Sequence, residues 1–127
     1  MKQLGVLGRV LFALPFGVMG LNHFLMKDYF LGIMSSFIPG GAYTILLTGA
    51  LLIFASISII LNKNLKLICF GLAGLLLIFI LTIHIPGLFD TSKFQTALIE
   101  LLKDSALMGA SLLLAINSEK DEKTSKN

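Results

Sequence analysis

The stretch LKLICFGLAGLLLIFILTIHIP, which runs from Leu65 to Pro86, decides how this chain folds. A helix needs about 20 apolar residues to cross the roughly 30 Å hydrocarbon core of a lipid bilayer, and this stretch is long enough. Three other stretches have a similar length and character, namely Leu4–Leu25, Gly41–Leu61 and Thr96–Ile116. The sequence therefore predicts an all-α fold, an integral membrane four-helix bundle.

The composition agrees with a membrane protein. Hydrophobic residues make up 56% of the 127 residues and charged residues 13%, which is about half the charged fraction of an ordinary soluble domain. We expect residues 1–116 to form a single four-helix transmembrane domain and residues 117–127 to form a charged, disordered cytoplasmic tail. The formal net charge of +3 is too small and too scattered to indicate a nucleic-acid partner.

Cysteine chemistry is excluded by the residue count. Cys69 is the only cysteine, so the chain has no intrachain disulfide, no CxxC redox relay and no cysteine-based zinc or iron–sulfur site. A Rossmann glycine motif is also absent from the sequence. The chain is thus not predicted to bind a nucleotide cofactor or to run a thiol relay by itself.

The positive charges of the short loops predict the orientation in the membrane, because Lys and Arg concentrate on the cytoplasmic side. With four crossings, the N-terminus, the loop 62–64 and the C-terminal tail lie on one side. The other side carries only Lys27 and Lys93. We therefore expect both termini in the cytoplasm. The basic residues of that side are Lys2, Arg9, Lys63, Lys66, Lys120, Lys123 and Lys126.

Ionisable residues within the apolar stretches are the candidate functional residues, because burying them in lipid is costly. At about 1.5 Å of helical rise per residue, His23 and His84 both fall near the outer end of the bundle. Glu100 lies in the first turns of the last helix, and Asp104 lies one turn deeper on the same face. We predict that these four residues line one outer polar pocket. There they would act as catalytic groups that handle protons or hold a quinone.

Other uses of the same residues stay open. Two imidazoles and a carboxylate also suit zinc, copper or non-haem iron. However, the chain has no HxxxH or ExxH motif, so we predict no metal site. Haem ligation by His23 and His84 has no sequence-specific support. In the simplest alternative, each histidine only forms a hydrogen bond in the headgroup region at the end of its helix.

Arg9 and Asp104 are candidates for a structural ion pair, since their charges are opposite. Their predicted depths differ by about 10 Å along the bundle axis, a gap that the long arginine side chain can partly close. In the alternative arrangement, Arg9 extends to the cytoplasmic headgroups instead. Lys103 is expected to pair with Glu100.

Two segments resemble the DoxX family. Residues Gly8–Phe24 (GRVLFALPFGVMGLNHF) are similar to its first helix, with an early arginine and a glycine before a polar end. Residues Leu102–Ala110 (LKDSALMGA) are similar to its last helix, where a Lys-Asp pair precedes a face of small residues. The resemblance implies a small four-helix protein of the bacterial inner membrane. It also implies that Arg9 and Asp104, which match family positions, are important.

The resemblance implies a role near quinone chemistry. Members of the family are linked to thiosulfate:quinone oxidoreductase and to a membrane oxidoreductase complex in oxidative-stress defence. We therefore expect a quinone-associated membrane subunit whose partners are the lipid bilayer, a quinone and a soluble or membrane redox protein. A non-catalytic scaffold or recruitment subunit is one alternative, and a small transporter is another.

Overall fold

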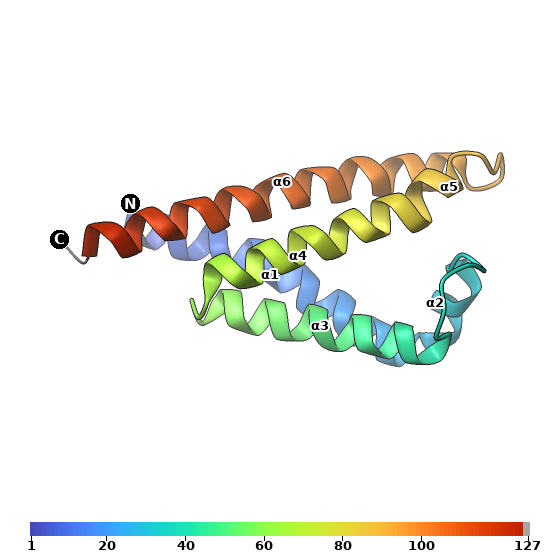
Figure 1. Ribbon diagram of the computed structural model, residues 1–127, viewed down its shortest axis with the longest axis horizontal. Coiled ribbons are helices and arrows are strands. Elements are labelled where there is room, and N and C mark those ends of the chain that lie inside the picture. The colour runs from blue at the N-terminus through green and yellow to red at the C-terminus, as the bar shows by residue number, and fades with distance from the viewer. Residues whose placement is uncertain (126–127) are drawn as a thin grey trace. The chain divides into compact units, whose positions relative to one another are not determined.

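A computed structural model describes residues 1–125 of the chain, in which all regular secondary structure is helical and there is no strand. The helices are α1 (Lys2–Leu25), α2 (Lys27–Ile33), α3 (Ala42–Ile60), α4 (Leu65–Phe79), the π-helical turn η1 (Ile80–His84), α5 (Ile85–Gly87) and α6 (Phe94–Ser125). The all-α prediction is confirmed. The four apolar stretches correspond to α1, to α3, to α4 with η1 and α5, and to the first two thirds of α6 (Figure 1).

The chain divides into two compact units, and the division falls after Leu65. The first unit contains α1, α2 and α3, and the second contains α4, η1, α5 and α6. The single domain over residues 1–116 and its four-helix bundle stay predictions from the sequence.

In the first unit, α1 and α3 pack against each other in antiparallel directions through small residues. A Cβ atom added to Gly20 would lie 2.6 Å from the backbone oxygen of Gly49, and one added to Gly17 would lie 2.8 Å from the Ser56 hydroxyl oxygen. Such close approach of two helix backbones is typical of membrane helices, where small residues line the contact. Ala13 and Leu52 are buried in the same unit.

The polar turn after α3 ends that helix as the sequence predicts. The N–H of Lys63 donates to the carbonyl of Ser58 at 2.9 Å, and the N–H of Asn62 donates to the carbonyl of Ile59 at 3.1 Å. This pair of hydrogen bonds is a Schellman motif. Asn62 and Asn64 have φ angles of 57° and 48°, a left-handed conformation that asparagine tolerates better than most residues.

In the second unit, α4 and α6 run antiparallel. The Ser111 hydroxyl donates a buried hydrogen bond of 2.8 Å to the carbonyl oxygen of Cys69, which ties the middle of α6 to the beginning of α4. Near the other end, a Cβ atom added to Gly87 would lie 2.8 Å from the Cβ of Ala97. The glycine thus allows α5 to approach α6 closely.

One segment differs from the sequence-based expectation. α6 continues to Ser125, so most of the tail that we expected to be disordered is helical, because its Glu and Lys residues favour helix and no Gly or Pro interrupts them. Residues 126–127 lie outside the described residues. The third apolar stretch was expected to end at Pro86, and the chain is helical to Gly87, so this helix end agrees with the prediction to within one residue. A π-helical turn, which was not expected, precedes the proline.

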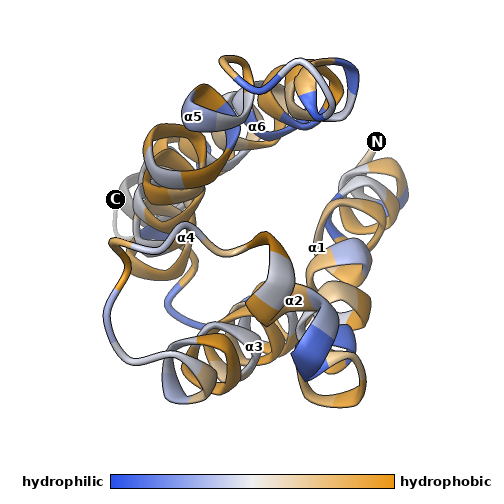
Figure 2. Cartoon of the chain, turned by 90° about the vertical axis from the view of Figure 1, so that its right-hand side faces the viewer, coloured by the Kyte–Doolittle hydropathy of each residue, from blue (hydrophilic) through white to orange (hydrophobic). Residues whose placement is uncertain are grey.

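Within residues 1–125, three helices are long and apolar enough to cross a membrane: Gln3–Leu25, Ala42–Ile60 and Leu65–Gly87. Fewer than half of the residues in the most apolar window of each span are buried inside the structure. Figure 2 shows apolar residues over α1, α3 and α4, with hydrophilic residues mainly at helix ends and in loops. α6 is not among the three, and it carries Glu100, Lys103 and Asp104 near its beginning.

Candidate functional site

The candidate site lies in the second unit, where a π-helical turn presents His84. The N–H of Ile85 donates to the carbonyl of Ile80, five residues back instead of the usual four. Pro86 follows immediately, and its ring clashes with the carbonyl four residues earlier in a regular α-helix. The wider turn relieves that conflict. π-Helical turns of this kind occur often at functional sites.

His84 forms a direct hydrogen bond with Asp104 across the two helices. The imidazole Nε2 donates to Oδ2 of Asp104 at 2.9 Å. The His84 and Asp104 side chains are only 11% and 9% exposed, so the pair is nearly buried. A carboxylate in this position fixes the orientation of the imidazole, because it accepts the hydrogen bond from Nε2.

Glu100 lies one helical turn before Asp104 and completes a cluster of three. One nitrogen or oxygen atom from each of His84, Glu100 and Asp104 lies within 4.8 Å of the other two. Glu100 also accepts a hydrogen bond from the Lys103 ammonium, as the sequence predicts. Both members of that ion pair are partly exposed, with 43% of the lysine and 37% of the glutamate side chain accessible. Glu100 therefore connects the buried His84–Asp104 pair with the surface.

The loop that leads into α6 is held by its own hydrogen bonds. Oδ1 of Asp90 accepts from the Ser92 hydroxyl at 2.6 Å and from the Ser92 N–H at 3.0 Å. Both hydrogen bonds lower the pKa of Asp90, and the bond from the Ser92 hydroxyl has the larger effect. The positive charge of nearby Lys93 acts in the same direction. Because a lowered pKa favours the carboxylate, this turn loses its bonds only when the pH falls through that lowered value.

His23 has a different environment in the first unit. Its Nδ1 lies 2.8 Å from the carbonyl oxygen of Met19 and donates a hydrogen bond to it. The ring stacks on Phe30 of α2, with centroids 4.0 Å apart and planes 14° apart. His23 therefore connects the end of α1 to α2. His23 and His84 belong to different units, so their meeting in one pocket stays a prediction.

Arg9 also belongs to the first unit. Its Nε is buried and has no hydrogen-bond partner among the described residues. A buried donor without a hydrogen-bond partner costs free energy, so pairing with a carboxylate would stabilise this guanidinium. The predicted pair with Asp104 joins residues of separate units and stays a prediction.

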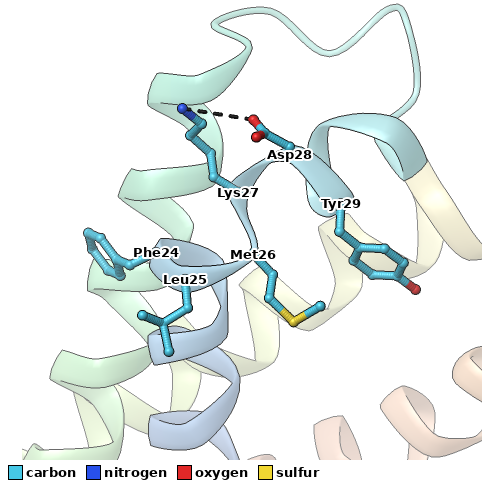
Figure 3. A pocket seen from close by; sticks show the side chains of 6 residues that line it. All are labelled: Phe24, Leu25, Met26, Lys27, Asp28 and Tyr29. Atoms are coloured by element: carbon cyan, nitrogen blue, oxygen red, sulfur yellow. Dashed lines mark ion pairs between the residues drawn. The ribbon is translucent and has the colours of Figure 1, made fainter.

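A shallow hollow of about 490 Å³ lies at the junction of α1 and α2 (Figure 3). Lys27 and Asp28 form an exposed ion pair of 3.9 Å at its edge. None of the four predicted pocket residues lines it. The hollow is lined by Phe24, Leu25, Met26, Lys27, Asp28 and Tyr29.

The sequence did not indicate that His84 and Asp104 bond directly. The available signal was the depth count, which places both near the outer end of antiparallel helices. The residues that carry the DoxX resemblance form most of α1 and part of α6. No family model, no curated protein and no solved structure matches this chain.

Proposed function

We propose that this chain is a DoxX-like multi-pass protein of the bacterial inner membrane, and a quinone-associated membrane subunit of an oxidoreductase system. The observation that supports this most is the buried hydrogen bond between His84 and Asp104. His84 belongs to a helical span that is apolar enough to cross a membrane. Ionisable residues at such depth are rare and usually serve a function.

The proposed chemistry of this chain is proton delivery. Reduction of a quinone to a quinol consumes two electrons and two protons, and a partner oxidoreductase supplies the electrons. A protonated His84 donates one proton to a quinone carbonyl oxygen, and Asp104 stabilises the imidazolium before transfer. Glu100 is partly exposed and close to both, so it returns protons from water to the pair. The second proton follows the same route.

The first test is the quinone content of the purified protein. We expect a quinone to co-purify with the full chain in mild detergent, detected by solvent extraction and by a redox difference spectrum. Asp104→Asn and His84→Gln should lower the bound quinone at least about tenfold, because each removes a group that holds the headgroup or its proton.

Ser111→Ala is the matched control, because it removes a buried hydrogen bond of the same unit outside the cluster. It should leave the quinone content unchanged. A quinone content equal to that of the surrounding detergent and lipid, in the unaltered chain, would exclude the quinone role. In that case recruitment of a soluble enzyme by the basic side would become the leading function.

The proposed topology, with both termini cytoplasmic, is tested by thiol labelling. Cys69→Ala first removes the native thiol. Lys63→Cys and Lys93→Cys are then introduced separately, so that each variant carries a single cysteine. We expect an impermeant maleimide added outside intact spheroplasts to label Lys93→Cys and to leave Lys63→Cys unlabelled. If only the thiol at position 63 is labelled from outside, the orientation is the reverse of the predicted one. Labelling of both thiols would contradict a membrane crossing between positions 63 and 93.

A further inference from the structure

The His84, Glu100 and Asp104 cluster has the composition of a metal site. It supplies one imidazole nitrogen and two carboxylates, all within 4.8 Å of one another. We propose that these three residues bind one divalent first-row transition metal ion of the zinc type. This proposal does not depend on the quinone role, because a bound ion would take the place of the proton that Nε2 of His84 shares with Asp104. It differs from the sequence-based prediction of no metal site, because these ligands come from two helices without a recognised spacing.

The distances suit such an ion after small side-chain movements. In a tetrahedral zinc site with bonds of about 2.1 Å, neighbouring ligand atoms lie roughly 3.4 Å apart. Nε2 of His84 and Oδ2 of Asp104 are 2.9 Å apart, so they need to separate by only a fraction of an ångström. Glu100 has to move inward from within 4.8 Å, which a flexible side chain does without moving a helix.

The ligand types select the metal class. An imidazole with carboxylates suits zinc, ferrous or manganous ions, whereas magnesium and calcium favour sites made of oxygen atoms alone. Three protein ligands leave one coordination position of a tetrahedral ion open. A metal there would therefore keep one position for water or another small molecule.

The structure also shows a competing cation at the same place. The Lys103 ammonium already forms an ion pair with Glu100, and both side chains are partly exposed. A pair of this kind is worth little, so a divalent ion can displace the lysine. The same exposure gives the ion a route to the buried His84 and Asp104.

The test uses cobalt as a spectroscopic substitute for zinc. The full chain is purified in detergent without a polyhistidine tag, dialysed against Co²⁺ and examined by visible absorption and metal analysis. We expect one Co²⁺ per chain with the intense bands of a tetrahedral ion, and displacement by Zn²⁺. Glu100→Gln should weaken binding at least about tenfold, because it removes a ligand. Lys103→Met should tighten binding up to about fivefold, because it removes the competitor.

Three comparisons make the outcome decisive. His84→Ala should abolish the bands, whereas His23→Gln should leave them unchanged, since the Nδ1 of His23 is already bonded to Met19. Glu100 is partly exposed, so its variant should stay folded even if His84→Ala does not. Absence of bound Co²⁺, or binding that survives Glu100→Gln, would overturn the proposal. Quinone measured in the same samples separates loss of the metal from failure of the quinone role.

Discussion

Gly20→Ala should destabilise the first unit, and Gly20→Leu should prevent α1 and α3 from packing. The Cβ of an alanine at this position would lie 2.6 Å from the Gly49 carbonyl oxygen and 2.9 Å from the Ile53 backbone nitrogen. Both atoms belong to the backbone of α3, so neither can move without moving the helix. Overpacking of this kind costs about 1–3 kcal/mol for a small addition.

Unfolding of the full chain in detergent is measured by circular dichroism as SDS is added. Gly20→Ala should unfold at a lower SDS fraction than the unaltered chain. Gly20→Leu adds three further carbon atoms at the same contact, so we expect it to elute as aggregate or to be recovered in poor yield. An alanine variant as stable as the unaltered chain would contradict the close contact of α1 and α3.

Two glycines provide matched controls. Gly8 lies on the same helix and Gly74 on α4, and a Cβ added to either meets no atom within 4 Å. Glycine in a helix interior is less favourable than alanine by up to about 1 kcal/mol. Gly8→Ala and Gly74→Ala should therefore keep or slightly raise the stability. A fall in all three variants would mean that Gly20 has no special place in the packing.

The long helices could be predicted from the sequence because length and hydropathy decide them. A stretch such as Leu65–Pro86 has no polar face to place in water, so few alternatives to a long apolar helix exist. The turn at Asn62–Asn64 was equally readable, because asparagine is one of the few residues suited to the left-handed conformations it adopts there. Local chemistry decides both features.

Features that depend on competition between backbone bonds were not predictable in the same way. The helix end near Pro86 was predictable, and the helix ends at Gly87, but the π-helical turn that precedes this end was not. The short helix α2 was not among the four stretches predicted to be helical. Its residues Lys27–Ile33 carry no helix signature apart from Asp28 in the first turn.

The site was partly predictable. Glu100 and Asp104 were expected on one face, because residues four apart on a helix are neighbours. The direct bond from His84 was not expected, since one extra residue in a π-helical turn rotates the following side chains by about 100° relative to a regular helix. The depth of a residue along a helix follows from counting, whereas the direction of its side chain depends on such irregularities.

Asp104→Leu should destabilise the second unit strongly, because it leaves the buried Nε2 of His84 without its acceptor. A buried polar group that loses its partner costs about 1–3 kcal/mol. Cys69 provides a built-in reporter, since its side chain is fully buried and it is the only thiol of the chain. We expect a thiol-reactive dye to label Cys69 at a lower temperature in Asp104→Leu than in the unaltered chain.

A double variant distinguishes the loss of a hydrogen-bond partner from a change in the shape of the site. Replacing both partners, His84→Leu with Asp104→Leu, removes the unpaired imidazole, so the double variant should regain much of the lost stability. Glu100→Leu is the control at the rim. It disrupts only a partly exposed ion pair and should change stability by less than about 1 kcal/mol. A double variant less stable than Asp104→Leu would contradict the role of the hydrogen bond.

Arg9 completes this series, because its buried Nε lacks a partner among the described residues. If Arg9 pairs with Asp104, the two substitutions remove one shared interaction. Arg9→Leu should then cost little in a chain that already carries Asp104→Leu, and the two effects should fall short of additivity by at least about 0.5 kcal/mol. Arg9→Met keeps an unbranched side chain without the charge and should behave in the same way. Strictly additive effects would instead mean that Arg9 extends to the lipid headgroups and that Asp104 pairs with His84 alone.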